Sequence, residues 1–192
     1  MAVTDYKYAG TAANVDRDGK ADWNNPDNAK ADDANKSSTN NIKNTYSDWL
    51  RLTNFGFSSA DIPDGSTING IEFVIKRSVS NDPTYTRTDH ALYLYDDGAV
   101  GNNMASGTNW PVSPEAEATY GGATDMCGTS LTQADIVTST FGIQLSVYSN
   151  NSSGSVFTVN SIKIRVYYTE GGGATSLPTR LFKRNYNHIL VR

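Results

Sequence analysis

The feature that most constrains this chain is a regular alternation of apolar and polar residues in four segments. Ile71, Phe73 and Ile75 alternate with Glu72 and Lys76 on the other face, and the same period recurs in segments 92–95, 141–147 and 162–168. Successive side chains of a strand point to opposite faces, so a period of two predicts strands with one dry and one wet face. Parallel sheets are buried on both faces and need crossover helices, so this pattern indicates antiparallel sheets packed face to face.

Weaker segments near residues 6–8, 49, 119–120 and 156–159 raise the expected number of strands to about seven to nine, the range of sandwiches and jelly rolls. We therefore predict an all-β fold, an antiparallel β-sandwich or jelly roll. The one helical turn expected lies at Thr132–Asp135, whose end residues can form a capping box. The predicted core consists of the residues with inward parity: Leu50, Leu52, Phe57, Ile71, Phe73, Ile75, Leu92, Leu94, Ile143, Leu145, Val147, Ile162, Ile164 and Val166.

Two segments stand outside the strand pattern. Residues 11–45 are polar and never periodic, which predicts a long N-terminal loop excursion over the surface. Gly171–Gly173 directly follows the last predicted strand, and a run of glycines behaves as a flexible joint. We expect one sandwich domain at 1–170 and a separate C-terminal tail at 171–192.

The tail is basic and apolar, and it has no acidic side chain after Gly173. A merely disordered tail would contain fewer apolar residues, although a frayed end is the simpler alternative. We predict that it anchors the chain by adding a strand to a partner or by filling a groove on it. The partner-binding candidates are Leu177, Arg180, Leu181, Phe182, Lys183, Arg184, Tyr186, Ile189 and Leu190.

Composition and motifs exclude several classes of function. The net charge of −4 lacks the basic excess of a nucleic-acid-binding domain, and the lone Cys127 allows no intrachain disulfide. No signal peptide or membrane-spanning apolar run is visible, so a protein made in the cytoplasm is expected. The two histidines, His90 and His188, stand in no zinc or nucleophile motif. We therefore predict no enzymatic activity, no nucleic-acid partner and no membrane association.

Asp16, Asp18 and Asp22 form the one ligand-like cluster. With Asn14 and Gly19 they match roughly positions 1, 3, 5, 6 and 9 of a twelve-residue calcium-binding loop, but the last ligand position is Asn25 in place of a bidentate Glu. The prediction is accordingly that no cofactor is bound, with calcium at Asp16, Asp18 and Asp22 as the alternative to a metal-free Asp-Gly turn.

Aromatic residues suggest a second class of function. We expect six of them at the surface, where they could stack on sugar rings as in carbohydrate-binding modules: Trp23, Trp49, Tyr93, Tyr95, Trp110 and Tyr167. The competing interpretation is burial in the core or in an interface, because the area that an aromatic side chain buries is large in both.

Several segments between Trp23 and Thr169 together resemble a recurring domain of tailed-bacteriophage structural proteins. They are Trp23–Ala29, Phe55–Phe57, Ile62–Ile71, Tyr120–Asp125, Phe141–Ile143 and Val166–Tyr168. Cys127 departs from the pattern, because a tryptophan is expected near it in relatives. The resemblance implies a virion component of the capsid, neck or tail, with other virion structural proteins as partners. We expect a homo-oligomer, because such particles are symmetric. A carbohydrate-binding sandwich is the alternative.

Overall fold

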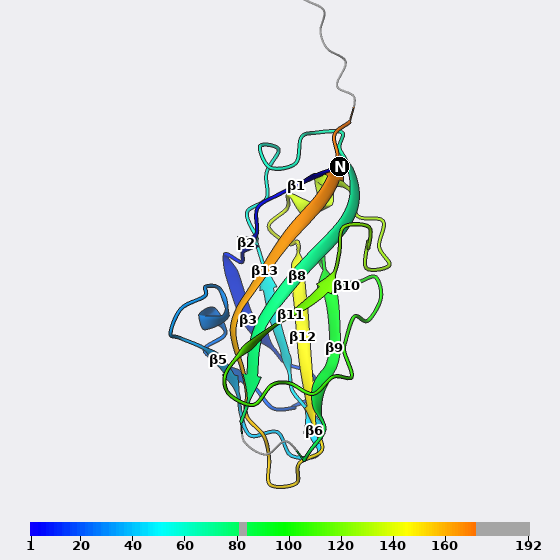
Figure 1. The fold of residues 1–192 in the computed structure, drawn as a ribbon. Coiled ribbons are helices and arrows are strands. Elements are labelled where there is room, and N and C mark those ends of the chain that lie inside the picture. The colour runs from blue at the N-terminus through cyan, green and yellow to red at the C-terminus, as the bar shows by residue number, and fades with distance from the viewer. Residues whose placement is uncertain (81–83, 172–192) are drawn as a thin grey trace, which may run out of the picture.

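The computed structural model describes residues 1–80 and 84–171, which form two antiparallel sheets packed against each other (Figure 1). The predicted all-β sandwich is confirmed. The described residues contain thirteen strands, more than expected, because five strands are only two residues long and show no alternation.

The first sheet has seven strands and is built on the two longest ones, β8 (Thr67–Val79) and β13 (Phe157–Thr169). These two strands pair along almost their whole length. The other strands of this sheet are β11 (Ala116–Gly121), β5 (Ser37–Thr39), β4 (Trp23–Asn24), β1 (Ala2–Val3) and β2 (Lys7–Tyr8).

The second sheet has six strands, and β12 (Gly142–Ser149) is central in it. β12 pairs with β9 (Arg87–Tyr95) on one side and with β7 (Trp49–Thr53) on the other. The remaining strands are β10 (Ala99–Val100), β3 (Thr11–Val15) and β6 (Thr45–Tyr46). The β12–β9 pair contains a bulge at Ser146/Val147, which leaves His90 without a direct partner.

The core lies between the two sheets, and every predicted core residue is buried in it. Their polar neighbours Glu72, Lys76, Lys163 and Arg165 are only partly buried, so the predicted registers are correct. The helical turn is confirmed as α1 (Gln133–Ile136), where the Thr132 backbone N–H donates to the Asp135 carboxylate at 2.7 Å. Among the described helices, none has the length and apolar character needed to cross a membrane.

The segment 11–45 is more ordered than predicted. It contains β3, β4, β5, the start of β6 and the 3-10 helix η1 (Pro26–Ala29), and it buries Trp23 and Ile42. The Trp23 indole N–H donates to Ser47 Oγ and to the Asp48 carbonyl. Strands of two or three residues offer too few positions for a periodic pattern, so the sequence resembled a loop.

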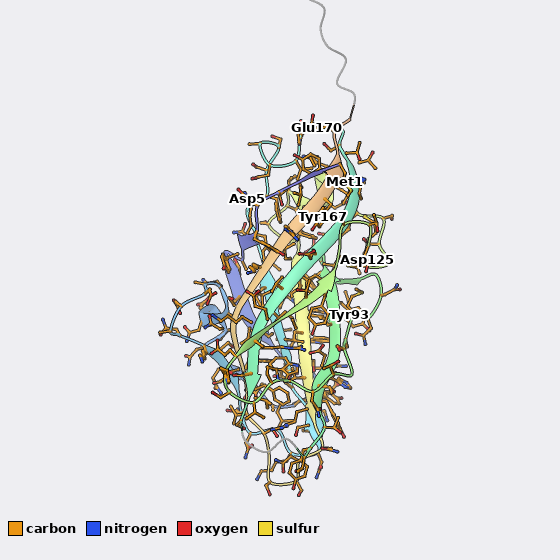
Figure 2. All side chains as sticks on the ribbon, in the orientation of Figure 1. Met1, Asp5, Tyr93, Asp125, Tyr167 and Glu170 are labelled. Carbon is orange, nitrogen blue, oxygen red and sulfur yellow. The ribbon has the colours of Figure 1, made fainter. Side chains whose placement is uncertain are left out.

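Both ends of the described body lie at the same end of the sandwich, as the labels on Met1 and Glu170 show (Figure 2). β1 pairs with the last residues of β13, with Ala2 opposite Tyr168. The predicted domain boundary at residue 170 therefore follows directly after a paired strand. The tail beyond it lies outside the described residues.

Candidate functional site

The outer surface of the second sheet gathers aromatic and basic side chains. Leu50, Leu92 and Leu145 point into the core, so the alternate residues of the same strands point outward. These outward residues and their neighbours in the adjoining turns are here called the basic–aromatic face: Arg17, Lys20, Tyr46, Trp49, Arg51, His90, Tyr93, Tyr95, Gln144 and Tyr148.

Arg17 lies at the centre of one half of this face. The centre of its guanidinium group is 4.3 Å from the Trp49 ring and 4.6 Å from the Tyr46 ring, and the ammonium group of Lys20 is 4.9 Å from the Tyr46 ring. Trp49 in turn packs edge to face on Tyr93, with 6.2 Å between ring centroids. Cations over ring faces are attracted by the negative potential of the π-system. The rings therefore hold Arg17 in a fixed position.

Arg51 occupies the other half of the face. Its guanidinium lies 4.1 Å from the Tyr95 ring, and its Nη2 donates to Gln144 Oε1 at 3.2 Å. Gln144 stands opposite Arg51 on one side and opposite Tyr93 on the other, so the pairing of β7, β12 and β9 sets this contact. Arg51 is thus oriented by the sheet itself.

His90 protrudes from the bulge in β9 and stacks on Tyr46, with 4.3 Å between centroids and 4° between the ring planes. Burial, followed by the positive charge of Arg17, lowers the pKa of His90 below its usual value of 6.5. The imidazole is therefore neutral at pH 7, mainly because it is partly buried and in smaller part because Arg17 is close to it.

The outer face of the first sheet is organised differently. Its cations are paired with carboxylates: Arg165 with Glu72 and Lys163 with Glu117, each at 2.8 Å, and Lys76 with Asp32 at 2.7 Å. Glu72 also accepts hydrogen bonds from Tyr6 and Tyr167. Burial and these contacts raise the pKa of Tyr6 to about 12.

Among the described residues, an ion pair between Arg77 of β8 and Asp89 of β9 lies in the interior. Arg77 Nη1 lies 2.6 Å from Asp89 Oδ1, and both side chains are almost fully buried. Asp89 also accepts hydrogen bonds from the Trp110 indole N–H at 2.8 Å and from the Tyr120 hydroxyl at 2.6 Å. Burial, followed by the charge of Asp89, raises the pKa of Tyr120. This network joins the two sheets, and we assign it to structure.

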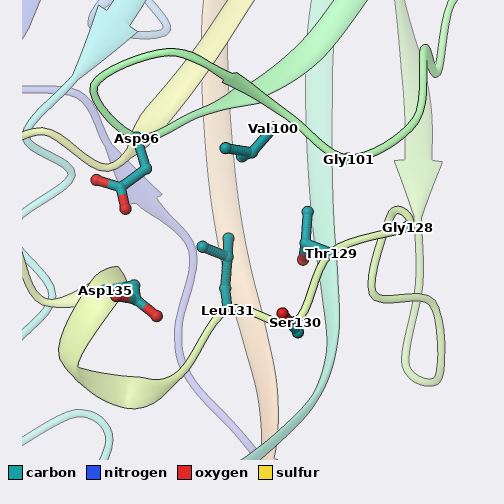
Figure 3. A pocket seen from close by; sticks show the side chains of 8 residues that line it. All are labelled: Asp96, Val100, Gly101, Gly128, Thr129, Ser130, Leu131 and Asp135. Atoms are coloured by element: carbon teal, nitrogen blue, oxygen red, sulfur yellow. The ribbon is translucent and has the colours of Figure 1, made fainter.

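A hollow of about 380 Å³ lies beside α1 (Figure 3). Its two carboxylates are already engaged, because Asp135 accepts from Thr132 and Asp96 accepts from the Thr140 hydroxyl at 2.8 Å. Hydrogen bonds from Thr132 lower the pKa of Asp135, so this group is a poor proton donor at neutral pH. No histidine or cysteine is among the residues that line the hollow, so they provide no paired nucleophile and base.

The calcium alternative is not supported. Within residues 1–80 and 84–171 no group of three acidic, histidine or cysteine side chains is placed to hold a metal ion. Asp16 accepts from the Gly19 N–H, whereas Asp22 accepts from the Asn14 and Asn40 side chains. The carboxylates of Asp16, Asp18 and Asp22 therefore do not converge, because the turn directs Asp16 and Asp22 to separate partners.

The six aromatic residues expected at the surface do not form one set. Trp23 and Trp110 are buried, which corrects that expectation, and their indole N–H groups are both hydrogen-bonded inside the protein. Tyr167 lies on the first sheet, while Tyr93 lies on β9 of the second sheet (Figure 2). The structure therefore brings together Trp49, Tyr93 and Tyr95.

Sequence reasoning missed the basic residues of the face. Arg51 could have been found, because it alternates with Leu50 and Leu52 and must point away from the core. Arg17 had no such signal, because it lies in a turn after β3.

The predicted partner-binding residues of the tail lie outside the described residues: Leu177, Arg180, Leu181, Phe182, Lys183, Arg184, Tyr186, Ile189 and Leu190.

No protein-family model matches this chain, and no curated protein matches its sequence.

Proposed function

We propose that this chain is a non-enzymatic structural protein of a tailed-bacteriophage virion, a component of the capsid, neck or tail. It docks on other virion proteins partly through residues 171–192. The resemblance of the segments between Trp23 and Thr169 to phage structural domains supports the proposal, and so does the two-sheet body that these residues form. Fold alone does not determine function, so the assignment depends on the resemblance and on the surface.

The observation that carries the docking role is the position of the chain ends. β1 pairs with β13. Both ends of the described chain lie at one end of the body, where the neighbouring residues are Met1, Ala2, Thr169 and Glu170. A segment that follows Gly171 can therefore engage a neighbouring subunit without opening either sheet. Its apolar residues gain by burial on that neighbour, because exposed apolar area is unfavourable in water.

The test is incorporation into particles. Virions assembled without the chain are supplied with full-length protein or with protein cut after Glu170, and the bound chain is quantified by mass spectrometry. We expect full-length protein in purified virions, reduced incorporation of the truncated protein, and equal melting temperatures for the two. Equal incorporation would refute the anchoring role, and a large loss of melting temperature would place the tail in the core of its own domain.

A carbohydrate-binding function is the second candidate, because Trp49, Tyr93 and Tyr95 share one face. Against it, Arg17 and Arg51 already lie over the rings of Trp49 and Tyr95, where a sugar would stack. A glycan array with wild-type protein and Tyr93→Ala separates the two functions. Specific sugar binding that is lost in the variant would favour the carbohydrate-binding module.

A further inference from the structure

We infer that the basic–aromatic face is a docking surface for an acidic surface of a neighbouring virion protein, whose Asp and Glu carboxylates pair with Arg17, Lys20 and Arg51. This inference rests on the proposed function and names the chemistry of one partner. It concerns the described face of the second sheet and is independent of the tail.

The charges of this face lack carboxylate partners. In the part of the chain that the structure describes, Arg17, Lys20 and Arg51 make no ion pair within 4.0 Å, whereas Lys76, Lys163 and Arg165 on the opposite face each make one. Asp16 and Asp18 flank Arg17 in sequence, but neither forms an ion pair with it, and Asp16 is bonded to the Gly19 N–H. A partner that supplies carboxylates would pair with Arg17, Lys20 and Arg51, as carboxylates of the chain itself pair with the cations of the first sheet.

The two guanidinium groups are held in place before a partner arrives. Arg17 lies against two rings, and Arg51 lies against Tyr95 and is bonded to Gln144. Arg17 Nη1 and Arg51 Nε are buried and have no hydrogen-bond partner, so ring contacts take the place of solvent around part of each group. Fixed side chains lose little conformational entropy on binding, and the guanidinium fork matches a carboxylate with two parallel hydrogen bonds.

The same geometry argues against two other occupants. Cations lie over Tyr46, Trp49 and Tyr95, so these rings do not offer the open platforms that stacking on sugars requires. If two copies of the chain docked through this same face, the Arg and Lys side chains of one copy would face those of the other. Like charges across an interface are unfavourable. Tyrosine, tryptophan and arginine are also the residue types that dominate protein interfaces.

The test compares two double variants of the full chain that remove equal charge. Arg17→Gln/Arg51→Gln alters the basic–aromatic face, and Lys163→Gln/Arg165→Gln alters the first sheet as the control. Poly-L-glutamate is titrated into each protein, and binding is followed by the NMR signals of the Trp49 indole N–H and of His90. All of these proteins contain the basic tail. Trp49 and His90 belong to the basic–aromatic face, so their signals report binding at that face. Incorporation into virions that lack the chain is measured in parallel.

We expect poly-L-glutamate to shift both signals in wild type and in the control variant. In the Arg17/Arg51 variant we expect at least about tenfold weaker binding and a similar loss of incorporation. If that variant melts at a lower temperature, Lys20→Glu replaces it, because Lys20 lies at 4.9 Å from the Tyr46 ring and, among the described residues, contacts no other ring.

Three results would overturn the inference: equal loss in the control variant, normal incorporation of the Arg17/Arg51 variant, or signal shifts produced by polygalacturonate or an oligonucleotide in preference to poly-L-glutamate. The last result would replace the protein partner with a glycan or a nucleic acid. Absence of wild-type chain from virions would instead refute the proposed function and the identity of the partner. The poly-L-glutamate titration would still test whether the basic–aromatic face binds carboxylates.

Discussion

The two outer faces of the sandwich both place cations over aromatic rings, but they differ in whether those cations also have carboxylate partners. On the first sheet a carboxylate lies within 2.8 Å of Lys76, Lys163 and Arg165, and the charges cancel within the chain. On the second sheet Arg17 and Arg51 lie over aromatic rings, which attract a cation without neutralising it. Among the described residues, the cations of one face are therefore paired with carboxylates, whereas Arg17 and Arg51 of the other face are not.

Strand register explains the difference. β8 and β13 place Glu72 directly opposite Arg165, and opposite charges in such positions attract across the sheet. On the second sheet the corresponding position opposite Arg51 is occupied by Gln144, which accepts a hydrogen bond but carries no charge. Two sheets of similar architecture thus acquire different surfaces through single outward positions.

The largest effect is expected at Arg77, a buried cation that has both a carboxylate and aromatic rings around it. Arg77 pairs with Asp89 and lies 4.7 Å from the Trp110 ring. Asp89→Ala should lower the free energy of unfolding by about 3–5 kcal/mol, because it leaves a buried charge without its partner. Urea denaturation measures this loss. Asp89→Asn keeps an acceptor for the Trp110 indole and should cost less. A loss below about 1 kcal/mol for the alanine variant would show that rings alone can hold a buried cation.

A smaller effect is expected from Glu72→Gln, which removes the central carboxylate of the first sheet. The free energy of unfolding should fall by about 1 kcal/mol, because Glu72 is only partly buried.

The same variant changes the titration of Tyr6. Its pKa of about 12 should move toward 10.0, although burial, the largest cause of the shift, remains. A group whose pKa is raised on folding stabilises the native state below its unfolded pKa, so wild type should lose stability as pH rises from 10 through 12. The variant should lose less over that range. Spectrophotometric titration measures the pKa, and an unchanged value would contradict the proposed role of Glu72.

On the second sheet we expect a still smaller effect from Arg17→Gln. The substitution removes the charge that depresses the pKa of His90, so this pKa should rise toward 6.5 while burial keeps part of the shift. Because the pKa is lowered on folding, His90 contributes stability above pH 6.5 that is lost as pH falls. NMR titration of the imidazole measures the shift, with Lys163→Gln as the control. A pKa that does not change would mean that Arg17 does not set the potential of this face.

No effect is expected from calcium. The turn that carries Arg17 also carries Asp16 and Asp18, so a bound ion would add further positive charge beside the basic–aromatic face. Calcium at about 1 mM and a chelator should give the same melting temperature, because a ligand of the native state must stabilise it by mass action. A rise in melting temperature with calcium that disappears in Asp22→Asn would restore the metal site.

The core and the candidate face differ in how far they could be predicted. The period-two alternation predicts that Ile71, Phe73 and Ile75 are buried. The same alternation predicts that Tyr93, Tyr95 and Arg51 point outward. The alternation says nothing about which outward residues meet. Tyr46, Arg17 and Trp49 come from three separate elements, and Trp23 and Trp110 were assigned to the surface although both are buried. Their burial depends on hydrogen-bond partners that lie far away in sequence.

The sequence by itself determined the two-sheet class, the four long strands, their inward faces and the capped turn at α1, because these depend on local periodicity and on contacts between close neighbours. Tertiary structure decided which strands lie side by side, that segment 11–45 supplies strands to both sheets, and that, among the described residues, the cations of one face are paired with carboxylates while those of the other are not. Pairing between distant strands fixes these features, since a shift of register by one residue would exchange Gln144 for a core residue opposite Arg51.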